Sequence, residues 1–94
     1  MAWKEIVDSK LGIVIIRAED CLHCVELRAI LSERPLSCSM VWIDKKNAHD
    51  LYAEFPLFAA SVDILPFAGI FSDGKLKHVV RAATRERIED VLSA

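Results

Sequence analysis

The chain has 94 residues, of which 53% are hydrophobic, and a formal charge of −2 at neutral pH. This length fits one domain, residues 1–94, with enough apolar side chains to close a core. Acidic and basic residues are mixed, and no basic stretch would neutralise several phosphates, so the composition argues against nucleic-acid binding.

The longest apolar run, Leu11 to Ile16, is too short to span a bilayer, and the first residues lack the layout of a signal peptide. Three cysteines are an odd number, which argues against a framework of structural disulfides and indicates a free thiol in a reducing compartment. We therefore expect a cytoplasmic protein without a membrane partner, in which cysteine serves chemistry or packing.

Elements of the first third follow from hydrophobic spacing. One amphipathic turn is expected within residues 1–10, and residues 11–17 are predicted as a buried strand because they are rich in β-branched side chains. A helix is predicted from Cys21 to about Glu33, where Arg34-Pro35 ends it. Its apolar positions recur at helical spacing: Cys24, Leu27, Ile30 and Leu31.

The middle of the chain predicts a second strand and a second helix. Residues 39–43 form a short apolar run typical of a buried strand. Asn47 is expected to cap the following helix, and Pro56 is expected to interrupt it. The apolar face of this helix is Leu51, Tyr52 and Phe55.

The last third predicts a loop, a hairpin and a final helix. Residues 61–65 lack periodicity, whereas residues 67–71 and 76–80 flank Ser72-Asp73-Gly74-Lys75, a strong signal for a tight hairpin. Thr84 is expected to cap a helix whose inner face is Ile88, Val91 and Leu92. The order βαβαββα predicts an α/β domain in which a mixed sheet of about four strands is flanked by helices on both faces.

Cys21 and Cys24 are three residues apart, where the first strand leads into a helix. On the first helical turn both sulfurs lie on one side, so they can form a disulfide without a large backbone movement. Unpaired N–H groups and the helix dipole favour the thiolate of Cys21, and the thiolate is the attacking species. We therefore interpret the two residues as a redox pair, with Cys24 as the shielded resolving thiol.

The charged residues around this pair have opposite effects on the stability of the Cys21 thiolate. A protonated His23 would stabilise the Cys21 thiolate and make the pair a stronger oxidant. Glu19 and Asp20 act in the opposite sense, although Asp20 has the alternative role of capping the helix. We expect the dipole and His23 to dominate.

A zinc site is an alternative of a different class. Cys21, Cys24 and Cys38, with His23 or His49, offer three thiolates and an imidazole. The sequence lacks a second Cys-x-x-Cys, which favours the redox interpretation and no bound metal. Cys38 is interpreted as a small strand residue, with a regulatory thiol as the alternative.

Two separated segments resemble the thioredoxin family, Val14–Cys24 around the cysteine motif and Leu65–Lys75 around a proline, a strand and a turn. Ile43-Asp44 at the end of the second strand fits the same resemblance. It implies a thioredoxin-like fold with a shortened amino terminus. It also implies that Pro66 follows a cis peptide bond and faces the disulfide.

The resemblance further implies a thiol–disulfide oxidoreductase that reduces protein disulfides through Cys21 and Cys24. Leu65 and Pro66 would form the surface on which an extended substrate segment binds. Phe67 is another candidate for this surface, with a core position as the alternative. Thioredoxin reductase or glutathione would supply electrons, and no cofactor is expected. The open alternative is a zinc-binding or redox-inactive interaction module of the same fold.

The sequence also departs from the family pattern. Leu22-His23 replaces the usual Gly-Pro between the cysteines, while Arg17 and Asp20 stand where the family usually has tryptophan, so the predicted substrate groove is more polar. The buried aspartate and lysine of the family fall at Ile15 and Met40. The resemblance therefore implies that their proton relay is absent.

Overall fold

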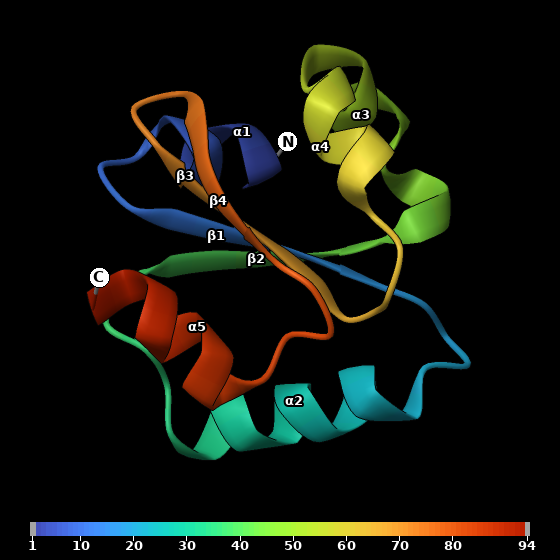
Figure 1. Cartoon of the computed structure of the whole chain (residues 1–94), viewed down its shortest axis with the longest axis vertical. Helices are drawn as coiled ribbons and strands as arrows, with labels where there is room; N and C mark the ends of the chain where they lie inside the picture. Colours follow the sequence, from blue (N-terminus) through green and yellow to red (C-terminus); the bar gives the residue numbers. More distant parts are fainter. Residues whose placement is uncertain (1, 94) are drawn as a thin grey trace.

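The computed structural model describes residues 2–93 and has a mixed sheet between two layers of helices (Figure 1). The elements in chain order are α1 (Ala2–Asp8), β1 (Gly12–Arg17), α2 (Leu22–Glu33), β2 (Ser39–Asp44), the 3₁₀ turn η1 (Lys45–Asn47), α3 (His49–Glu54), α4 (Pro56–Ser61), β3 (Phe67–Ser72), β4 (Lys75–Val80) and α5 (Arg85–Ser93).

The four strands lie in the order β2-β1-β3-β4. β1 pairs with β2 in parallel, from Gly12 opposite Ser39 to Arg17 opposite Asp44, and with β3 in antiparallel orientation. Helices α2 and α5 cover one face of the sheet, while α1, α3 and α4 cover the other (Figure 1). The predicted mixed sheet of four strands with helices on both faces is therefore confirmed.

Strand β1 is buried on both faces because it lies inside the sheet. Ile13 and Ile15 pack toward α2 and α5, whereas Val14 and Ile16 pack toward the opposite helical layer. This alternation follows from the two-residue period of a strand. All four side chains are 0% exposed, as the apolar run in the sequence predicts.

The core on the second face is aromatic. Phe58 of α4 is fully buried, and its ring centroid lies 5.6 Å from that of Phe67 and 5.7 Å from that of Phe71. Gly69 of β3 lies beneath the same ring, because a Cβ at this position would come within 2.5 Å of Phe58 Cε1. The side chain of Phe58 thus fixes α4, and the loop that follows it, to the sheet.

The hairpin and the last helix match the sequence prediction. Asp73 and Gly74 have φ angles of +52° and +81°, as a two-residue turn between right-twisted strands requires. The Oγ1 of Thr84 accepts a hydrogen bond of 3.1 Å from the Arg87 N–H, which caps α5. Ile88 is fully buried on the inner face of that helix.

Four local expectations need correction. Residues 2–8 form a helix rather than one turn, with Trp3 and Val7 buried. Asn47 does not cap α3, because residues 45–47 form a 3₁₀ turn and Ala48 takes the cap position. Residues 39–43, expected as a buried strand, form an edge strand in which only Ile43 is buried. Pro56 separates α3 from α4, as expected, and it starts α4 at a position where a missing N–H costs no hydrogen bond. Ile30 is 39% exposed, because α2 turns this side of its surface away from the sheet.

Candidate active site

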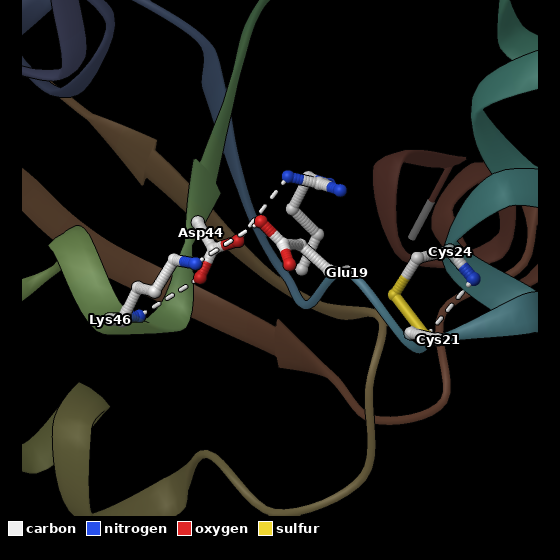
Figure 2. Close-up of polar contacts among 6 residues, drawn as sticks. Glu19, Cys21, Cys24, Asp44 and Lys46 are labelled. Atoms are coloured by element: carbon white, nitrogen blue, oxygen red, sulfur yellow. Dashed lines mark hydrogen bonds and ion pairs between the residues drawn. A yellow bond between two sulfur atoms is a disulfide. The ribbon is translucent and has the colours of Figure 1, made fainter.

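The cysteine motif begins α2, directly after the carboxyl end of β1. Cys21 has extended backbone angles and caps the helix, since its Sγ accepts a hydrogen bond of 3.1 Å from the Cys24 N–H (Figure 2). A disulfide joins Cys21 to Cys24, with Cα atoms 5.2 Å apart. The alternative role of Asp20 as the helix cap is therefore wrong, because the neighbouring Cys21 sulfur occupies the cap.

The two sulfur-bearing residues differ in access. Cys24 is 2% exposed, whereas Cys21 is only partly buried at the start of the helix. Leu22 and Val25 beside them are 70% and 58% exposed, so the amino-terminal end of α2 presents apolar side chains to solvent. Cys21 is therefore the more accessible of the two cysteines.

The segment leading to the motif is tied to the end of β2. Arg17 Nη1 donates to Asp44 Oδ2 at 3.4 Å, across the last pair of the β1–β2 register. Lys46 Nζ donates to Glu19 Oε1 at 3.1 Å (Figure 2). This contact raises the pKa of Lys46, although the solvent exposure of both side chains keeps its contribution to stability small.

His23 lies on the exposed surface of α2. Its Nδ1 is 3.2 Å from Glu26 Oε1, and the imidazole is 80% exposed. The polar partner of the ring is thus a carboxylate one turn along the helix rather than a cysteine sulfur. Any influence of His23 on the cysteines acts through space and is weakened by solvent.

The loop before β3 lies beside α2. Hydrogen bonds from the β4–α5 connection hold it on its other side. The Leu65–Pro66 peptide bond is cis, which confirms the expectation drawn from the resemblance. The Ile64 carbonyl accepts from the Ala82 N–H at 3.2 Å, and the Pro66 carbonyl accepts from the Ala83 N–H at 2.7 Å. Among the described residues, no backbone hydrogen bond of a turn or loop involves Leu65.

An ion pair holds the same loop at its start. Arg81 Nη2 lies 2.6 Å from Asp63 Oδ2, and the hydrogen bond from this guanidinium lowers the pKa of Asp63. Asp63 Oδ1 also accepts from the Ile64 N–H at 2.6 Å. The turn after β4 and the loop before β3 therefore form one connected surface.

A groove of about 400 Å³ runs between this surface and α2. It brings together His23, Leu65 and Pro66 from the predicted site. Its remaining lining comes from α2, from the loop before β3 and from the β4–α5 connection: Glu26, Leu27, Ile30, Ile64, Ala82, Ala83, Thr84, Arg85 and Glu86. The lining is mainly apolar, and Glu26, Arg85 and Glu86 add charged side chains to it.

Two further candidates for the substrate surface have different positions. Asp20 is exposed in the turn before Cys21 and does not line this groove. The side chain of Phe67 is 0% exposed and packs against Phe58, so its expected place on the substrate surface is wrong. The alternation along β3 turns Phe67 into the aromatic core.

The sequence did not predict that residues 82–86 line one side of the groove. No local pattern marks these residues, because only the hydrogen bonds between the two loops bring them to the groove. The Arg17–Asp44 ion pair was also missed, since it joins residues 27 positions apart. The spacing of His23 and Glu26, three residues apart on one helix, would have predicted their pairing.

The zinc alternative has no site within residues 2–93, where no three His, Cys, Asp or Glu side chains are placed to hold a metal ion. Cys38 precedes β2, and Ser39 pairs with Gly12 at the start of β1. Cys21 follows the opposite end of β1, about 20 Å away for a strand of this length. In the described part of the chain, no helix is long and apolar enough to cross a membrane.

Comparisons with known proteins agree with this architecture. No family model and no curated protein matches the sequence. A mutant thioredoxin from Halobacterium salinarum NRC-1 is similar in structure, with a TM-score of 0.74 and 17% identity over 97% of this chain and 80% of that chain. Schistosoma mansoni thioredoxin has a TM-score of 0.75 and 17% identity over 98% of this chain and 82% of its own.

Thioredoxin from Trypanosoma brucei brucei is similar as well, with a TM-score of 0.68 and 19% identity over 99% of this chain and 85% of that chain. At such low identity, these similarities establish the fold. The chain therefore has the thioredoxin fold, with a Cys-Leu-His-Cys disulfide at the start of α2.

Proposed function

We propose that this protein is a thiol–disulfide oxidoreductase that exchanges the disulfides of protein substrates through Cys21 and Cys24. The observation that carries the proposal is the disulfide at the amino end of α2, with Cys21 as the accessible helix cap and Cys24 buried behind it. Thioredoxin-fold neighbours support it.

The reaction begins with the reduced pair. The Cys21 thiolate attacks one sulfur of a substrate disulfide, so a bond forms to Cys21 and the substrate bond breaks. The released substrate thiolate takes a proton from solvent. The Cys24 thiolate then attacks Cys21, which frees the second substrate thiol and leaves the Cys21–Cys24 disulfide. Two electrons have passed to the substrate.

The groove between α2 and the loop before β3, which reaches the cysteine motif at His23, is the proposed substrate surface. The Ile64 and Pro66 carbonyls are committed to Ala82 and Ala83, whereas the Leu65 backbone groups have no such partner. Leu65 therefore has a donor and an acceptor available to an extended substrate segment. Pro66 contributes to the apolar lining of the groove. Asp20 is proposed to contact the substrate from the turn before Cys21.

His23 is proposed as a modulator of the pair rather than a group that touches the sulfurs. A protonated His23 would favour the Cys21 thiolate, and the Glu26 carboxylate beside the ring would offset part of this effect. Thioredoxin reductase or the glutathione pool is the proposed electron source, and the cytoplasmic location stays a prediction. The net direction of electron flow depends on the potential of the pair, measurable by thiol counting in glutathione or dithiothreitol buffers.

The test is insulin reduction driven by dithiothreitol, with three Cys→Ser variants. We expect Cys21→Ser to abolish activity and Cys24→Ser to accumulate a mixed disulfide visible by mass, because the first bond forms but is not resolved. Cys38→Ser is the matched control and should retain full activity, because Cys38 lies at the opposite end of the sheet. Full activity of Cys21→Ser, or an inactive wild type, would refute the proposed function.

A further inference from the structure

The sheet has two edges, formed by β2 and β4, and within residues 2–93 no additional strand pairs with the outer side of either. An edge strand presents unpaired N–H and C=O groups, which invite pairing with another chain. Proteins that remain monomeric usually protect such an edge with lysine, proline, a bulge or an inward charge. The two edges of this sheet differ sharply in that protection.

Strand β4 carries several of these devices. Lys75 and Lys77 place positive charges along it, and both are exposed. Its pairing with β3 also contains a register shift between Ile70 and Phe71, where the strand is irregular. A second strand approaching this edge would meet repelling charges and an uneven row of backbone groups.

Strand β2 has none of these protective features between residues 39 and 43. This stretch, Ser-Met-Val-Trp-Ile, contains no charged residue and no proline. Its pairing with β1 runs without interruption from Ser39 to Asp44. The backbone groups on its outer side therefore form a regular, unprotected row.

The side chains of β2 are also incompletely covered. Met40 and Trp42 project to the face of α2, Val41 projects to the opposite face, and all three are only partly buried. Beside them lies an open groove of about 250 Å³ between α2 and β2, to which Met40 and Trp42 contribute. The Arg28 guanidinium carbon lies 5.5 Å from the Trp42 ring centroid and covers part of that ring.

We propose that β2 is a self-association edge, at which a second copy of this chain pairs in antiparallel orientation and joins two four-stranded sheets into one. A two-fold axis perpendicular to the sheet leaves each residue on its own face, so opposed side chains share a face. Centred on Val41, this register places Val41 opposite Val41 and Met40 opposite Trp42 of the second copy. Ser39 then lies opposite Ile43.

This register brings no like charges opposite one another, and its central pairs join apolar side chains. Within the paired stretch every contact is between uncharged residues, and the two Asp44 carboxylates lie beyond it at opposite ends. In this register, Met40 of one copy covers more of the partly exposed Trp42 side chain of the other copy. The same stretch thus supplies both halves of an isologous interface, as a symmetric dimer requires.

The arrangement leaves the proposed redox sites free. The cysteine motif follows the carboxyl end of β1, and β1 runs parallel to β2. Because the two β2 strands are antiparallel, the two cysteine motifs point to opposite ends of the dimer. Association at β2 and disulfide exchange at Cys21 are therefore compatible in one molecule.

The test compares wild type with Val41→Lys and Val41→Glu by sedimentation over a range of concentrations. We expect a concentration-dependent wild-type dimer, and a dissociation constant more than about tenfold higher for each variant, because like charges then face each other. An equimolar mixture of the two variants should recover the dimer, since lysine then faces glutamate. Val79→Lys is the matched control on β4, where Val79 is 38% exposed, and should dimerise like wild type.

Hydrogen exchange of the wild type provides a measurement that does not depend on the folding of any variant. Amide protection in residues 39–43 should rise with protein concentration, while protection in β4 should not. The proposal is overturned if the wild type is monomeric up to about 1 mM, if residues 39–43 show no concentration dependence, or if folded Val41→Lys still dimerises.

Discussion

Replacement of Phe58 by alanine tests whether the aromatic core holds the loop at residues 62–66 in place. Phe58 is 0% exposed and contacts the rings of Tyr52, Phe67 and Phe71, with centroid separations of 5.6 to 6.4 Å. Removing a buried phenylalanine costs about 3–5 kcal/mol, because apolar burial is lost and a cavity remains. A domain of this length has a total stability of roughly 5–14 kcal/mol, so the loss is a large fraction.

The assay is urea unfolding followed by far-UV circular dichroism. With a slope of about 1.5 kcal/mol per M, the expected loss lowers the midpoint by about 2–3 M. Leu57→Ala is the matched control, because Leu57 is the preceding residue of α4 and is 81% exposed, so its midpoint should move little. Insulin reduction should fall for Phe58→Ala, since α4 leads directly into the loop at residues 62–66.

The reasoning is refuted if Phe58→Ala lowers the midpoint no more than Leu57→Ala. A large stability loss with unchanged insulin reduction would separate the two claims: the core would depend on Phe58, but the loop before β3 would not.

Three further outcomes are expected. Thr84→Ala should lower stability by about 1 kcal/mol in urea unfolding, because it removes the cap on the Arg87 N–H, and an unchanged midpoint would contradict that role. Burial raises the pKa of Cys38, so its thiol stays protonated to higher pH, and its alkylation should be slower than that of free cysteine at pH 9.0 and accelerate above it; equal rates would exclude the shift. Arg17→Met should cost about 1–2 kcal/mol, because Asp44, only 10% exposed, loses its cation, and a midpoint equal to wild type would show that the pair contributes nothing.

Local patterns in the sequence were enough to predict the central strands, the helix after the cysteine motif and the hairpin. The reason is that alternation with period two and spacing near 3.6 fix which residues share a face. Asp73-Gly74 could be assigned to a turn because few residues tolerate a positive φ. The apolar spacing after β1 likewise predicts a helix that has Cys21 at its start.

Sequence by itself determined that two cysteines three residues apart begin a helix, which fixes their capacity to form a disulfide and leaves Cys24 within the first turn. Tertiary structure decided what surrounds them. The groove lining at residues 82–86 and the Arg17–Asp44 pair depend on contacts between distant segments. Phe67 is in the core because β3 lies beneath α4, and Ile30 is exposed because of how α2 is rotated on the sheet. The periodicity of the sequence predicts which side chains share a face of a helix or strand. Only tertiary packing decides which other elements, or solvent, contact that face.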